Sequence, residues 1–231
     1  QGTGANVIIP NGGVRIMYTD GAGSGAAVAD PIGLLGGTGN IALGSGAMGT
    51  ALTTGTDNVA IGENALDAVT SGARNTAVGD NAAGAITTGA DNVAVGTNAL
   101  LVGTTGTYNV AIGRSALVAA TTGAYNIAIG GLSLDALTTA DNNIAIGYQA
   151  LTANTSGTDN VGVGTNALDA NTTGSDNTAI GDNALGANTT ASNNTAIGSS
   201  ALLLNATGTA NTAVGFEALE NNIANGHAAV G

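Results

Sequence analysis

Few side chains in this sequence could carry out catalysis. The chain of 231 residues contains one His, no Cys and no Trp, and charged residues make up 8% of it. The single imidazole, His227, could serve as a general base only beside a nucleophile and an orienting carboxylate. It occupies an Asn position of the sequence repeat described below, which favours a polar structural role. We therefore predict that the protein is not an enzyme and uses no cofactor.

The acidic residues are candidates for paired carboxylates. Several fall at variable positions of the repeat, where side chains should point to water: Glu63, Asp67, Asp80, Asp169 and Asp182. A solvated face is therefore the expected role of these residues. The Gly-rich segment 21–25 is a candidate phosphate loop, but it lacks the following Lys-Ser/Thr pair. We expect it to be a linker.

Calcium is the metal that an acidic β-structure could bind. Four carboxylates share one repeat position: Asp57, Asp91, Asp159 and Asp176. Three other residues interrupt that file, so it supplies no continuous set of oxygen ligands: Arg74, Tyr108 and Tyr125. We predict no metal site, with weak calcium binding as an open alternative. The two tyrosines are expected to stack on successive coils.

The composition excludes several other classes of protein. Lys and Arg number 3 against 15 Asp and Glu, a formal net charge of −12. Phosphate backbones would be repelled, so no nucleic-acid partner is predicted. No apolar run reaches the roughly 18 residues that a membrane span needs, and the protein is not expected to span a membrane. Hydrophobic residues make up 43% of the sequence, which favours a folded chain.

A heptadecapeptide repeat organises most of the chain. The string Asn-x-Ala-Ile/Val-Gly recurs once in each copy, and Gly162 alone replaces its Ala. We number the repeat positions 1 to 17 from its Asn, which recurs as Asn58, Asn75, Asn92, Asn109, Asn126, Asn143, Asn160, Asn177, Asn194 and Asn211. An earlier copy begins at Asn40, one residue further back than the period requires. A partial last copy begins at His227, one residue early.

This period predicts an all-β protein. Helical and propeller repeats need roughly 33 or more residues, so the much shorter unit found here makes one coil of a parallel β-solenoid, or β-roll. Stacked coils pair each strand with its equivalent in the next coil, at about 4.8 Å per step. We assign about twelve coils to residues 40–231 and a non-repeat arm or cap with short strands to residues 1–39.

Stacking should superpose equivalent residues into polar ladders and tight corners. We expect the position 1 Asn of each coil to bond its amide to the Asn above and below and to satisfy backbone groups of the turns. The Gly at position 5, as in Gly62, Gly79 and Gly96, should occupy a corner with positive φ or a close backbone approach.

Apolar ladders should supply a thin dry core. We expect it to contain the position 4 residues, such as Ile112, Ile129 and Ile146, and the position 9 residues, such as Leu151 and Leu168. The small Ala at positions 3 and 8 should keep this core thin.

The repeat motif resembles a known group. Asn-x-Ala-Ile-Gly-x-x-Ala-Leu, with Asn-Thr-Thr between copies as in residues 177–190, is similar to the YadA-like head repeats of trimeric autotransporter adhesins and to repeats of phage and bacterial tail fibres. The resemblance covers residues 40–231. It implies a left-handed parallel β-roll in a secreted, elongated structure of a cell surface or virion, one that works by contact. Whether one chain or three form the rod stays open.

The two ends of the sequence favour self-assembly. Two short strand candidates flank the turn signal at residues 10–13, and the last coil shows no capping pattern. We hypothesise a head-to-tail homopolymer in which the arm of one copy covers the last coil of the next. Its interface residues would be Val7, Ile8, Ile9, Val14, Ile16, Tyr18, Ala229 and Val230.

Two alternative functions stay open. One is a trimeric adhesin or tail-fibre shaft that binds a surface receptor or glycan. The lesser one is ice binding through the Thr pairs at positions 13 and 14. Because adjacent residues of a strand point to opposite faces, each coil should offer one outward Thr. In later coils an Asn would share that outer face, as in Asn171 beside Thr173.

Overall fold

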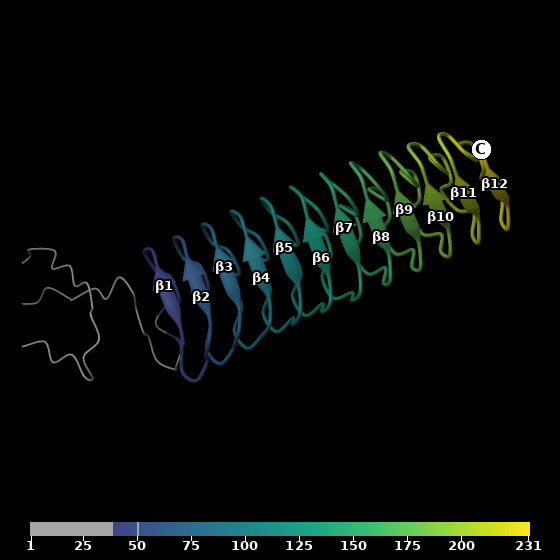
Figure 1. The fold of residues 1–231 in the computed structure, drawn as a ribbon. Helices are drawn as coiled ribbons and strands as arrows, with labels where there is room; N and C mark the ends of the chain where they lie inside the picture. The colour runs from purple at the N-terminus through teal and green to yellow at the C-terminus, as the bar shows by residue number, and fades with distance from the viewer. Residues whose placement is uncertain (1–38, 50) are drawn as a thin grey trace, which may run out of the picture.

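The computed structural model describes residues 39–49 and 51–231. Within these residues the protein is a parallel β-solenoid with no helix, as the repeat predicts. Twelve three-residue strands form one sheet in chain order, and Figure 1 shows them succeeding one another along a rod. The arm or cap expected over residues 1–39 lies outside the described residues, apart from Gly39.

Each strand occupies positions 2 to 4 of its coil. The strands are β1 (Ile41–Leu43), β2 (Val59–Ile61), β3 (Thr76–Val78), β4 (Val93–Val95), β5 (Val110–Ile112), β6 (Ile127–Ile129), β7 (Ile144–Ile146), β8 (Val161–Val163), β9 (Thr178–Ile180), β10 (Thr195–Ile197), β11 (Thr212–Val214) and β12 (Ala228–Val230). Their Val, Ile and Thr residues favour extended backbone.

The pairing register superposes equivalent residues of successive coils. Ala111 of β5 pairs with Ala128 of β6, for example. The first interval between repeats is one residue longer than the period and the last is one residue shorter. The strands keep their register in both places, because Ala42 pairs with Ala60 and Ala213 pairs with Ala229. Eleven steps between twelve strands make a sheet about 53 Å long, at about 4.8 Å per step.

Glycine at position 5 turns the chain directly after each strand. Gly79 and Gly96 have φ of 136° and 129°. A Cβ on Gly79 would lie 2.7 Å from the carbonyl carbon and oxygen of Gly96, one coil further on. Both reasons expected for glycine at this position therefore apply, because the backbone is left-handed there and another backbone passes close by.

Three further positions of each coil are left-handed without being glycine. Position 7 is represented by Asn98 (φ 58°), position 9 by Leu100 (φ 51°) and position 17 by Tyr108 (φ 58°). Asn tolerates this conformation well, whereas Leu and Tyr do not. The coil therefore holds strained residues in place by packing and hydrogen bonds.

The core is thinner than we expected. Ala at positions 3 and 8 and Leu at position 9 are buried, including Leu151 and Leu168. The predicted core role of position 4 is wrong: Ile112 is 37% exposed, Ile146 is 38% exposed, and Ile129 is half-buried. Positions 2 and 4 point away from the coil interior because position 3 points into it.

Candidate functional site

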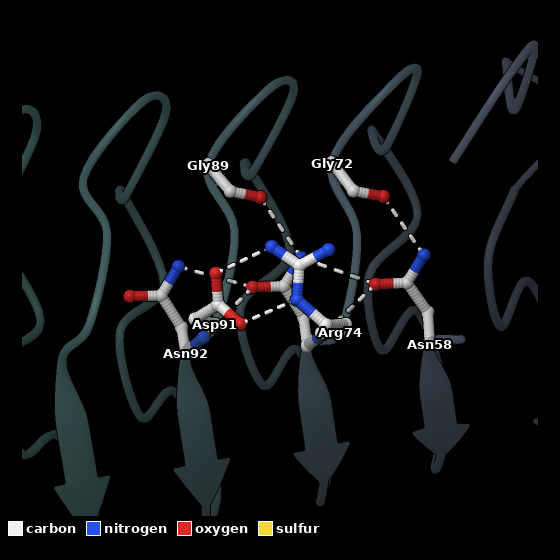
Figure 2. A network of polar contacts seen from close by, with 7 residues as sticks. Asn58, Gly72, Arg74, Gly89, Asp91 and Asn92 are labelled. Atoms are coloured by element: carbon white, nitrogen blue, oxygen red, sulfur yellow. Dashed lines mark hydrogen bonds and ion pairs between the residues drawn. The ribbon is translucent and has the colours of Figure 1, made fainter. Parts of the chain in front are cut away.

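The position 1 Asn side chains form a hydrogen-bonded ladder through the described rod. They are buried from Asn40 to Asn211. The Oδ1 of Asn58 accepts the backbone N–H of Asn75 over 2.9 Å, and its Nδ2 donates to the carbonyl of Gly72 over 2.8 Å. Figure 2 shows Asn58 and Asn92 in equivalent places of the rod. The amide of Asn58 thus binds the start of one strand and one bend, and the same pair of bonds recurs at Asn75, for example.

A second Asn ladder lies inside the later coils, at position 12. Asn154, Asn171, Asn188 and Asn205 are buried there, and side-chain hydrogen bonds link the first three. The Nδ2 of Asn171 donates to Oδ1 of Asn154 over 3.2 Å, and that of Asn188 donates to Oδ1 of Asn171 over 2.9 Å. The predicted outward direction of Asn171 is therefore wrong. The apolar residues at position 12 of earlier coils, such as Val69 and Leu137, were the signal that this position faces inward.

The Thr pairs lie at bends and not in strands. The carbonyl of Thr87 accepts the N–H groups of Thr70, Ser71 and Gly72 at 2.9, 3.2 and 3.1 Å. The hydroxyl of Thr70 donates to the same carbonyl over 3.0 Å. Position 13 hydroxyls are therefore used between coils, while position 14 side chains such as Thr88 are exposed. Adjacent Thr side chains do not alternate between two faces here, because the backbone bends.

Position 17 carries mostly exposed side chains, and two pairs of them contact each other across neighbouring coils. Arg74 forms two hydrogen bonds with the carboxylate of Asp91, at 2.6 and 2.7 Å (Figure 2). These bonds raise the pKa of Arg74 and lower the pKa of Asp91. Tyr108 and Tyr125 stack with ring centroids 5.1 Å apart and planes 8° apart, which confirms that expectation.

Most of the carboxylates named from the sequence are solvated. Glu63, Asp67, Asp80 and Asp182 are exposed, as expected. Asp169 is half-buried, and this burial raises its pKa because the charged form loses hydration. Its expected solvated role is therefore only partly right. Within the described residues, no three His, Cys, Asp or Glu side chains gather into a group that could hold a metal ion.

His227 takes the place of the Asn in the last coil. Its backbone N–H donates to Oδ1 of Asn211 over 2.9 Å, so it continues the backbone part of the Asn ladder. His227 is exposed.

The segment 21–25 lies outside the described residues. In the part of the chain that is described, no helix is long and apolar enough to cross a membrane.

The outer face of the sheet carries partly exposed apolar side chains in every described coil. It consists of positions 2 and 4 of the strands, and we call it the outer face. Position 4 is Leu, Ile or Val in all twelve strands. Position 2 is Ile or Val in β1, β2 and β4 to β8, Thr in β3 and β9 to β11, and Ala in β12. The apolar file is therefore continuous at position 4 and interrupted at position 2, and exposed apolar surface of this kind is typical of an interaction site.

The predicted polymer interface can be placed only at one end. Val7, Ile8, Ile9, Val14, Ile16 and Tyr18 lie outside the described residues. Ala229 and Val230 belong to β12, which pairs with β11 along one edge, and Val230 is 83% exposed.

Comparisons of the chain with protein families, with curated proteins and with solved structures found no match.

Proposed function

We propose that this chain is a structural rod protein that assembles with copies of itself, side by side along the outer face, into the shaft of a secreted fibre. The observation that carries the proposal is the apolar file at position 4, which runs along all twelve strands in register. Parallel sheets usually bury both faces. One face of this sheet covers the coil's own core, and the other exposes β-branched apolar side chains.

The size of the outer face sets how much it can contribute to association. Two files of side chains about 6.6 Å apart, along a sheet about 53 Å long, cover roughly 350 Å² between them. Stable pairs bury about 600–1,000 Å² per partner. The outer face would therefore form the centre of an interface to which flanking residues of each coil also contribute. The resemblance to trimeric adhesin heads supports a three-chain shaft.

Charge placed on the outer face tests this proposal. Ile112→Lys with Ile146→Lys should separate the assembly into monomers, because two charges would be buried between chains. Thr122→Lys with Ser156→Lys is the matched control, since it adds the same charges to exposed residues of the same two coils. Light scattering after size exclusion measures the mass, and circular dichroism checks folding. A monomeric wild type, or an unchanged mass in the Ile variant, would contradict the proposal.

Head-to-tail polymerisation is a second candidate, and it rests on the apolar strand candidates that the sequence places around the turn at residues 10–13. Apolar strands of one copy can pair with the edge of a sheet in another copy. Deletion of residues 1–20 should then shorten or abolish filaments seen by electron microscopy. Unchanged filaments would count against the arm.

Binding to ice, a receptor or a glycan would be an additional contact function of the same rod. The exposed position 14 hydroxyls, such as Thr88, Thr105 and Thr122, favour a test for ice binding. A thermal-hysteresis assay decides it. Binding to a receptor or glycan stays a prediction from the resemblance alone.

A further inference from the structure

We propose that Tyr108 and Tyr125 form an oxidative cross-linking site that joins two neighbouring coils through a dityrosine bond. The two rings stack almost in parallel, with centroids 5.1 Å apart. Both side chains are accessible, with 51% and 57% of each residue exposed. An oxidant can therefore reach both phenols, and each phenol has its reaction partner already beside it. This inference goes beyond the proposed shaft function and does not depend on it.

The backbone holds the two tyrosines in register. The N–H of Tyr125 donates to the carbonyl of Thr107 over 3.1 Å. The next residue is fixed by the Asn ladder, because the N–H of Asn126 donates to Oδ1 of Asn109 over 3.0 Å. Both tyrosines have nearly the same left-handed φ, 58° and 59°, so their Cα–Cβ bonds leave the coils in the same direction. The backbones of the two tyrosines therefore stay in register unless the rod opens.

The pair is isolated from other aromatic rings in the described residues. Position 17 holds Asp91 in the coil before and Asn142 in the coil after. Tyr148 is exposed, but it lies at position 6 and takes no part in a stacked pair. Coupling should therefore give one defined product within the chain.

The reaction balances with a peroxide and a peroxidase. The oxidant removes one hydrogen atom from each phenol, and the two phenoxyl radicals combine through the carbons next to their oxygens. The two ring hydrogens at those carbons then move to the oxygens, which restores both phenols. The protein loses two hydrogen atoms in total, and hydrogen peroxide is reduced to two molecules of water. Rotation about the exposed side-chain bonds lets the rings open from the stack as the bond forms.

The positions of the arginines make the product easy to identify. The chain contains three Lys or Arg residues, and Arg114 lies between the two tyrosines in sequence. Trypsin therefore separates fragments 75–114 and 115–231 of the denatured chain unless Tyr108 is joined to the second fragment. The test treats the dilute full chain with a plant peroxidase and hydrogen peroxide, followed by denaturation, trypsin and mass spectrometry. We expect the two fragments to remain joined, with two hydrogen atoms lost and the blue fluorescence of dityrosine.

Conservative variants test which two tyrosines form the dityrosine bond. Tyr108→Phe and Tyr125→Phe keep a ring in the stack but remove a phenol, so the fragments should separate, whereas Tyr148→Phe should behave as wild type. The cross-linked rod should also unfold at a higher temperature, because the bond closes a loop in the unfolded chain. The proposal is overturned by absent coupling, by joined fragments in Tyr125→Phe, by products that are mainly cross-linked chain dimers, or by an unchanged unfolding temperature.

Discussion

At the scale of single residues, the buried amides stabilise the rod by bonding backbone groups of neighbouring coils. Asn109 shows why: its Oδ1 accepts the N–H of Asn126, and its Nδ2 donates to the carbonyl of Gly123 over 2.8 Å. Both backbone groups lie at buried residues. A buried backbone group that loses its partner costs about 1–3 kcal/mol.

Asn109→Ala should therefore lower the free energy of unfolding by about 2–5 kcal/mol, since it leaves two backbone groups without partners. Asn98→Ser is the matched control at position 7, where Ser115 occurs naturally, and it should change stability little. Urea unfolding followed by circular dichroism measures both variants. Equal stability of the two variants would show that the ladder is dispensable.

Asp169 makes the stability of the rod depend on pH. Burial raises its pKa in the folded state above that of the unfolded chain. The folded state therefore binds the proton more tightly, and this contribution to stability is present below the unfolded pKa and lost as pH rises through the folded pKa. Asp91 behaves in the opposite way, because Arg74 lowers its pKa and its contribution is lost as pH falls.

Asp169→Asn should consequently raise the unfolding temperature at neutral pH and have less effect in acid. Asp182→Asn removes the same charge from an exposed residue and is the control. Thermal unfolding of both variants from neutral to acidic pH gives the comparison. A benefit that grows towards acid would refute the assignment of the burial effect to Asp169.

At the scale of the element, glycine has opposite effects on stability inside a strand and at the corner that follows the strand. The coil of β8 contains both cases, because Gly162 stands inside the strand at position 3 and Gly164 follows the strand at position 5 with φ 138°. A Cβ on Gly162 would lie 3.2 Å from the carbonyl oxygen of Ala167, a place that Ala fills in the other coils. A Cβ on Gly164 would meet the backbone of Gly181.

Gly162→Ala should stabilise the protein by about 0.5–1 kcal/mol, because it reduces the freedom of the unfolded chain. Gly164→Ala should destabilise it by about 2 kcal/mol or more, because it adds left-handed strain and a clash. Denaturant unfolding of both variants measures these opposite signs. Two changes of the same sign would contradict the assigned corner.

At the scale of the whole molecule, each coil contacts its two neighbours, so the rod should tolerate the removal of a complete coil. Deletion of residues 143–159 removes one period and restores the Asn ladder between Asn126 and Asn160. We expect the shortened chain to keep its β-type circular dichroism and cooperative unfolding. Deletion of residues 143–151 breaks the register and should lower the unfolding temperature strongly. If the two deletions lowered the unfolding temperature equally, the assignment of one coil to each repeat would be wrong.

The spacing of residues by itself determined the period, the parallel stacking, the Asn ladder and the glycine corners. These features follow from local rules, since an Asn or Gly at fixed intervals has the same backbone role in every coil. The stack of Tyr108 and Tyr125 follows from the same repeat interval.

Only the tertiary structure decided which apolar residues lie inside. The sequence Val-Ala-Ile of a strand alternates in direction, and hydrophobicity alone favours Val and Ile in the core. A coil with several left-handed corners has a narrow interior, so the small Ala111 faces the core and Ile112 lies on the outer face. The same closure turns Asn171 inward and holds Leu100 left-handed. Space inside the closed coil, which depends on every position of the repeat together, decides these directions against local preference.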